Sequence, residues 1–136
     1  MWKNDFSMEA KISAEEIWKI WTDVENWKDW VGSIEYSKIE GKFENGTFIT
    51  TKAVNGLKSK FWLKDVVENK SFTIQTKLPL CTMCFTHELE NNNNGLKITL
   101  GIKINGILTF VFKNIIGKSV STGLPISVKK LIEMVS

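Results

Sequence analysis

The sequence predicts an α+β fold in which a curved, seven-stranded antiparallel sheet surrounds a long C-terminal helix, with two short helices after the first strand. Three observations predict it: alternating apolar and polar residues near the N-terminus, six further apolar segments separated by turn residues, and helical spacing of apolar residues from about residue 107. With 136 residues, the chain is expected to form a single domain over residues 1–136.

The first strand is predicted over residues 2–12, where apolar side chains such as Trp2, Phe6 and Ile12 alternate with polar ones. A period of two places one set of side chains on the core face of a sheet. Asn-Gly pairs, a proline and an asparagine run then mark turns between shorter apolar segments. These segments predict strands at about residues 33–40, 47–54, 58–67, 71–77, 82–90 and 96–105.

Two short helices are predicted after the first strand. Ser13 is a favourable N-cap, and Glu16 three positions later completes a capping box. Asp23 is positioned to cap a second short helix that carries Trp27 and Trp30.

The C-terminal helix is predicted from apolar residues that recur every three or four positions. The stripe consists of Ile107, Val111, Ile115, Leu124, Val128, Leu131, Ile132 and Val135. Gly117, Gly123 and Pro125 interrupt it, so a kink or a break is expected in this segment.

The charge pattern argues against nucleic-acid binding and against a membrane span. All 18 basic residues are lysines, interspersed with acidic residues, for a net charge of +3. The sequence contains no arginine, which is the residue that proteins prefer for binding phosphates and guanine edges. No nucleic-acid partner is therefore expected. The most apolar run contains Lys103 and Lys113, which would each cost about 2.5–3.5 kcal/mol at the centre of a membrane helix. A cytoplasmic location is the default expectation, and the abundance of Lys, Asn and Ile suggests a bacterial source.

The segment from Ile12 to Trp30 resembles the opening of the SRPBCC superfamily, also called START/birch-pollen-allergen-like. The resemblance rests on Ile12, Ala14, Trp18, Asp23, Trp27 and Trp30, and it continues through residues 72–99, 104–108 and 123–131. It is nearest to the polyketide cyclase/dehydrase-like branch. The resemblance implies a helix-grip fold with a cavity between the sheet and the final helix, and it covers essentially the whole chain.

A curved sheet wrapped around one helix leaves space that the inner side chains do not fill. Apolar walls with a few polar groups are typical of ligand sites. The predicted ligand-binding residues on the inner strand faces and the helix are Tyr36, Phe61, Leu63, Phe72, Ile74, Met83, Phe85, His87, Ile98, Leu100, Ile107 and Val111.

Two of these residues are polar, and each has two interpretations. His87, the only histidine, would orient a ligand or transfer protons, or else it is a core histidine bound to the backbone. Tyr36 is either a hydrogen-bond partner for a ligand or a packed tyrosine.

Cysteine and tryptophan residues raise further candidates. Cys81 and Cys84 form a CxxC pair at a strand start, where residues three apart face opposite ways, so we expect reduced cysteines with a packing role. One histidine and two cysteines are too few for zinc, so no metal is expected, and no cofactor motif is present. The tryptophans of the two short helices would either enclose a ligand or anchor these helices to the sheet. Trp62 is either a residue that contacts a partner protein or one that packs on the protein surface.

Three functions remain open at this stage. The first is binding or carriage of a small apolar or amphipathic ligand in the cavity. The second is an enzyme resembling the polyketide cyclase/dehydrase branch, with His87 and Tyr36 as candidate groups. The third is a protein-interaction module resembling chaperone activators, with Trp62 and the lysine-rich strand around it as the contact surface. The catalytic residues, the ligand and the oligomeric state are not predicted.

Overall fold

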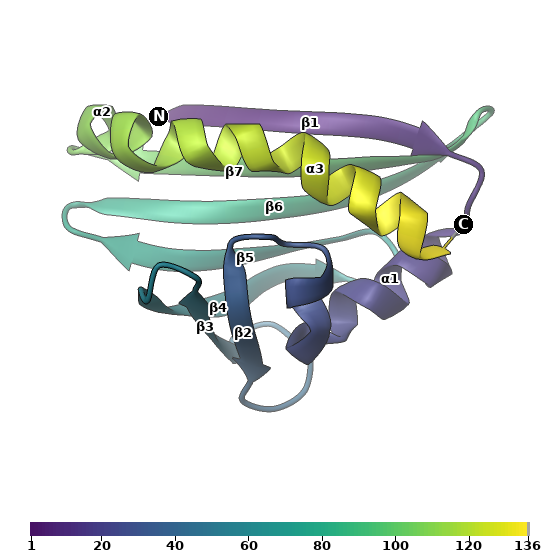
Figure 1. Ribbon diagram of the computed structural model, residues 1–136, viewed down its shortest axis with the longest axis horizontal. Coiled ribbons are helices and arrows are strands. Elements are labelled where there is room, and N and C mark those ends of the chain that lie inside the picture. Colours follow the sequence, from purple (N-terminus) through teal and green to yellow (C-terminus); the bar gives the residue numbers. More distant parts are fainter. Residues whose placement is uncertain (136) are drawn as a thin grey trace.

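The computed structural model describes residues 1–135, apart from the side chains of residues 117 and 118, and it shows one sheet with helices against its inner face (Figure 1). The seven strands are β1 (Trp2–Ala10), β2 (Ile34–Ile39), β3 (Phe48–Ala53), β4 (Lys58–Val67), β5 (Ser71–Leu78), β6 (Cys81–Asn92) and β7 (Gly95–Gly106). The helical segments are α1 (Ala14–Thr22), the 3-10 helix η1 (Val24–Asp29), α2 (Thr109–Phe112), the π-helix η2 (Lys113–Gly117) and α3 (Lys118–Val135).

The sheet is antiparallel throughout, with the strand order β1-β7-β6-β5-β4-β3-β2. After β1, the helices α1 and η1 carry the chain to the far edge, where β2 begins a meander that returns to β1. The long helix α3 then lies across β1 and β7 (Figure 1). The predicted α+β, helix-grip architecture is therefore confirmed, with its seven strands and two short helices after the first strand.

The start of α1 has the predicted capping box. The backbone N–H of Glu16 donates to Ser13 Oγ at 3.2 Å, and the backbone N–H of Ser13 donates to Glu16 Oε1 at 3.3 Å. Asp23 occupies the N-cap position of η1, but its side chain makes no capping hydrogen bond. It accepts one from Asn26 Nδ2 at 2.7 Å instead.

A bulge in β2 corrects the prediction for Tyr36. The pairing of β2 with β3 shifts register between Ile34 and Tyr36. One extra residue on one strand reverses the faces of the residues that follow. Ser37 is therefore buried, with its hydroxyl donating to the Val24 carbonyl, while Tyr36 is 41% exposed and lies outside the inner face.

The entry to the long helix corrects a second prediction. Ile107 and Ile115 were expected to face the sheet, yet they are 76% and 67% exposed. A neighbouring stripe is partly buried against the core instead, formed by Leu108, Phe112, Ile116 and Val120. Both stripes have four-residue spacing, so periodicity alone could not choose between them.

The expected interruption of the C-terminal helix is the π-helical turn η2. It separates the single turn of α2 from α3. Pro125, which was also expected to interrupt the helix, lies inside α3 as the structure defines it. Within residues 1–135, no helix has both the length and the apolar character needed to cross a membrane.

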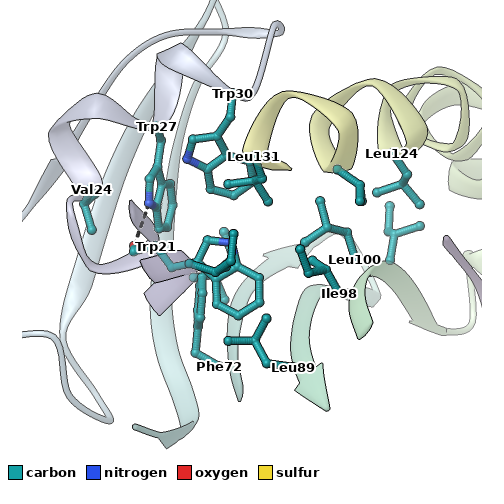
Figure 2. Close-up of a cluster of buried hydrophobic side chains, with 14 of the residues drawn as sticks. Trp21, Val24, Trp27, Trp30, Phe72, Leu89, Ile98, Leu100, Leu124 and Leu131 are labelled. Atoms are coloured by element: carbon teal, nitrogen blue, oxygen red, sulfur yellow. Dashed lines mark hydrogen bonds between the residues drawn. The ribbon is translucent and has the colours of Figure 1, made fainter. Parts of the chain in front are cut away.

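The core lies between α3 and the central strands. Leu124, Val128 and Leu131 of α3 are buried, and they continue the predicted helical stripe. Figure 2 shows Leu124 and Leu131 facing Ile98 and Leu100 of β7. Alternation along β7 leaves Ile98 and Leu100 at most 3% exposed.

The capping box gives a stability prediction. Ser13→Ala removes the acceptor for the Glu16 N–H, so we expect a loss of about 1 kcal/mol in the free energy of unfolding. Urea denaturation measures the loss, and Ser33→Ala, at an exposed loop position, is the control. Equal stabilities of the two variants would contradict a stabilising role for the cap.

Candidate functional site

A cavity of about 460 Å³ lies between the inner face of the sheet, α3 and the segment that joins η1 to β2. This volume falls within the range of small-molecule sites. Its walls are Trp27, Trp30, Val31, Gly32, Ser33, Ile34, Thr51, Phe61, Ile74, Phe85, Thr86, His87, Leu100, Gly101, Ser119, Val120, Thr122, Gly123, Leu124, Ile126 and Ser127.

Five of the residues predicted to line a cavity do so, and all five come from the central strands: Phe61, Ile74, Phe85, His87 and Leu100. Strand alternation brings them to the inner face, because successive side chains of a strand point to opposite sides. Phe61 and Phe85 are in edge-to-face contact, with 5.8 Å between ring centroids.

The other seven predicted residues lie elsewhere. Four of them are buried in the packed core rather than in the cavity wall: Leu63, Phe72, Met83 and Ile98. Tyr36 and Ile107 are exposed, for the reasons given above, and Val111 does not line the cavity. The inner face is thus divided between a solid aromatic core at one end and a cavity at the other.

Sequence reasoning missed most of the wall that the helices supply. Trp27 and Trp30 come from η1 and its end, while Val120, Leu124 and Ser127 come from α3. The two tryptophans were candidates for a ligand cage, and they do lie at the cavity. The α3 residues continue the helical stripe that packs on the sheet. Their spacing of three or four residues was therefore the sequence feature that could have identified them as part of the wall.

An aromatic cluster fills the space beside the cavity. His87 stacks flat on Phe72, with ring centroids 3.9 Å apart and an interplanar angle of 8°. Trp21 meets both rings edge to face, at 5.4 Å from Phe72 and 5.5 Å from His87. Figure 2 shows Trp21 over Phe72, with Trp30 beside Leu131 of α3 and Trp27 on the side of Trp30 away from that helix. Offset and edge-to-face pairs each add about 0.5–1.5 kcal/mol beyond burial.

The tryptophan N–H groups are only partly satisfied. Trp27 Nε1 donates to the Trp21 carbonyl at 2.8 Å (Figure 2). The Nε1 atoms of Trp21 and Trp30 are buried and have no hydrogen-bond partner within the described part of the chain. Both indoles contact His87 edge to face, and aromatic faces are weak acceptors for N–H groups. Apolar and aromatic packing therefore holds this end of the cavity, without a polar network.

His87 is a buried, uncharged imidazole. Its Nδ1 lies 3.3 Å from the Phe72 carbonyl oxygen, and the residue is 7% exposed. Burial lowers the pKa of His87 from 6.5 to about 3, while the carbonyls of Phe72 and Phe85 raise it to a lesser extent. At neutral pH this side chain can orient a ligand oxygen, but it carries no charge. The structure shows the backbone contact of the second interpretation and also places His87 at the cavity wall, while a role toward a ligand stays a prediction.

The two cysteines lie apart from the cavity wall. Cys81 is buried and Cys84 half-buried, and both are free thiols. Burial raises the pKa of the Cys84 thiol, which opposes formation of a reactive thiolate. Trp62, the candidate contact residue, is half-buried on the outer face of the sheet, where it pairs with Phe48 and Gln75.

A second hollow, of about 320 Å³, lies over β5, β6 and β7 and is shallower. Both positively and negatively charged side chains surround it, namely Lys70, Lys97, Glu88 and Glu90. An open, charged hollow suits water better than a small apolar molecule, so the inner cavity is the stronger candidate site.

Comparison with known proteins identifies the fold. No protein-family model matches this sequence, and no curated protein matches it. Among solved structures, the di-domain ARO/CYC StfQ from the steffimycin biosynthetic pathway aligns over 98% of this chain and 50% of its own, with a TM-score of 0.79 and 7% identity. Norcoclaurine synthase from Thalictrum flavum aligns over 98% and 86%, with a TM-score of 0.73 and 17% identity.

A structural-genomics protein from Nitrosomonas europaea aligns over 98% of this chain and 93% of its own, with a TM-score of 0.76 and 15% identity. Identities this low show the fold alone. The chain has the same helix-grip fold as these proteins, so the fold that the sequence resemblance implies is confirmed.

The shifted pKa of His87 predicts a pH dependence of stability. In the unfolded chain the imidazole protonates near pH 6.5, but in the folded protein only near pH 3, so acid favours unfolding across this window. Between pH 7 and pH 4.5 the wild type should lose about 2–3 kcal/mol that a His87→Gln variant does not lose. Urea denaturation at each pH measures both proteins, and parallel pH profiles would contradict the buried neutral imidazole.

Proposed function

We propose that this protein binds or carries a small, uncharged and mainly apolar ligand in the cavity between the sheet and α3. The observation that supports it most is the character of the wall. Among the described residues that line the cavity, none carries a charge at neutral pH, and most are aliphatic or aromatic. An ion without a partner in such a site would cost several kcal/mol, so a neutral molecule is favoured.

A few polar groups would orient the ligand. Thr51 and Ser127 are buried residues of the wall, on opposite sides of the cavity, and each hydroxyl can donate or accept one hydrogen bond. His87 adds a neutral imidazole. These groups suit a ligand with one or two carbonyl or hydroxyl oxygens on an apolar frame.

The cavity also has a route of entry. Gly32 and Ser33, before β2, are exposed, and so are Ser119 and Ile126 of α3. Because all four residues also line the cavity, the opening lies between this loop and the helix. A ligand could enter there without disturbing the sheet.

Gly123 provides a direct test of occupancy. It lines the cavity, and a Cβ built on it meets no atom within 4 Å. Gly123→Phe should therefore fill the cavity and weaken binding of an apolar fluorescent probe at least tenfold without unfolding the protein. Gly123→Ala keeps the space and is the matched control, with wild-type affinity and up to about 1 kcal/mol more stability. If Gly123→Phe binds the probe as the wild type does, the ligand site is not this cavity.

A second test concerns charge. At pH 7, 2-acetylnaphthalene should bind at least tenfold tighter than 2-naphthoate, because the cavity wall offers no cation to the carboxylate. Quenching of the protein's tryptophan fluorescence, to which Trp27 and Trp30 of the cavity wall contribute, measures both affinities. Thr51→Val should weaken binding of the ketone by about 0.5–1.5 kcal/mol and leave 2-ethylnaphthalene unchanged. Equal affinities for ketone and carboxylate would overturn the preference for neutral ligands.

A polyketide-cyclase-like activity is the second candidate, favoured by the fold similarity to StfQ. In the described part of the cavity wall, His87 is the one ionisable group available for proton transfer. General acids and bases work best with a pKa near the working pH, and that of His87 is about 3. We therefore place binding first. Turnover of an aromatic polyketide analogue by the wild type, lost in His87→Gln, would reverse this order.

A further inference from the structure

Exposed apolar side chains collect at one end of the molecule. Scattered single examples are normal on a protein surface, whereas a gathering of them marks an interaction site. Each of these side chains is at least 62% exposed, and we call them the apolar end: Met1, Val54, Leu57, Leu80, Ile107, Phe110 and Ile115.

Strand register brings these residues to the same end of the sheet. The turns that connect β3 to β4 and β5 to β6 follow the pairs Lys52–Lys58 and Leu78–Cys81. Cys81 in turn pairs with Gly106, the last residue of β7 before α2, and the start of β1 pairs with β7 at Ile104. Figure 1 shows the N-terminus, α2 and the turn between β5 and β6 together at this end, far from α1.

The centre of the apolar end is held in place by its backbone. The Ile107 N–H donates to the Leu80 carbonyl at 3.0 Å, which joins two of the connecting segments. Gly106 has φ +133°, and a Cβ there would meet the Leu80 carbonyl oxygen at 2.4 Å, so this close approach requires glycine. Leu80 and Ile107 therefore project from an ordered surface.

The charges around the apolar end are mainly positive. Lys58, Lys77, Lys103 and Lys113 are all exposed there. The segments that carry most of this end, residues 45–64, 69–87 and 91–132, contain no acidic residue. The start of β2 also lies here, because Ile34 pairs with Ala53, and the Glu35 carboxylate on it is already paired with Lys52 Nζ at 3.1 Å. On β1 the nearest acidic residue is Asp5, which pairs with Gly101, several residues along the strand.

We propose that the apolar end docks on the surface of an anionic lipid bilayer. The apolar side chains of this end would insert at the boundary between the lipid headgroups and the acyl chains, while the lysines contact acidic headgroups. Charge favours this partner over a second copy, because two copies would bring like charges together. The apolar tips and the absence of arginine favour lipid over nucleic acid.

The test is co-sedimentation of the full chain with vesicles of phosphatidylcholine alone or with 30% phosphatidylserine. We expect binding to the phosphatidylserine vesicles, weakened by salt. The double variant Ile107→Ser/Phe110→Ser should bind at least tenfold more weakly. Its matched control is Val67→Ser/Met134→Ser, which changes two exposed apolar residues outside both the apolar end and the cavity wall and should bind as the wild type does. Lys77→Gln and Lys113→Gln should each weaken binding about fivefold.

Three outcomes would overturn the proposal. The first is that the wild type binds both vesicle types equally or binds neither. The second is that the two double variants bind alike, with thermal unfolding showing that both are folded. The third is a dimer on gel filtration that only Ile107→Ser/Phe110→Ser disrupts, without vesicle binding, which would assign the apolar end to a second copy of the chain.

Discussion

The stacking of His87 on Phe72, with Trp21 packed against both rings, is the contact on which the rest of the arrangement depends. The segment formed by α1 and η1 carries the chain from one edge of the sheet to the other, and its tryptophans dock on this pair. This docking fills one half of the inner face with aromatic rings. A cavity remains between this aromatic cluster, the central strands and α3, because α3 lies mainly over β1 and β7.

The cavity and the core are therefore made by the same strands. Along β6, His87 belongs to both, since one face of its ring packs on Phe72 while the residue also lines the cavity. Burial keeps the imidazole neutral, and a neutral imidazole is compatible with an apolar wall. Core packing thus sets the electrostatic character of the site, without any charged residue being placed there for that purpose.

The fold could be predicted from sequence because each element carried its own local signal. Alternation identified the strands, Asn-Gly pairs located turns, and Ser13 with Glu16 marked the start of α1. Residues of the cavity wall could be predicted only where strand alternation places their side chains on the inner face of the sheet, as for Phe61 and Leu100. Tyr36 was misplaced because a bulge has no period, and Phe72 because alternation tells which face a side chain occupies but not whether a neighbour covers it.

The π-helical turn η2 affects the direction in which the apolar stripe of the long helix points. Residues spaced by four drift around an α-helix by about 40° at each step, since a full turn takes 3.6 residues. The sheet-facing stripe runs from Leu108 through Val120 to Val128 in steps of four, and an uninterrupted α-helix would carry it off the sheet. A π turn holds more residues and offsets part of this drift. The number of residues between β7 and the middle of α3 is therefore constrained, although that segment is largely exposed.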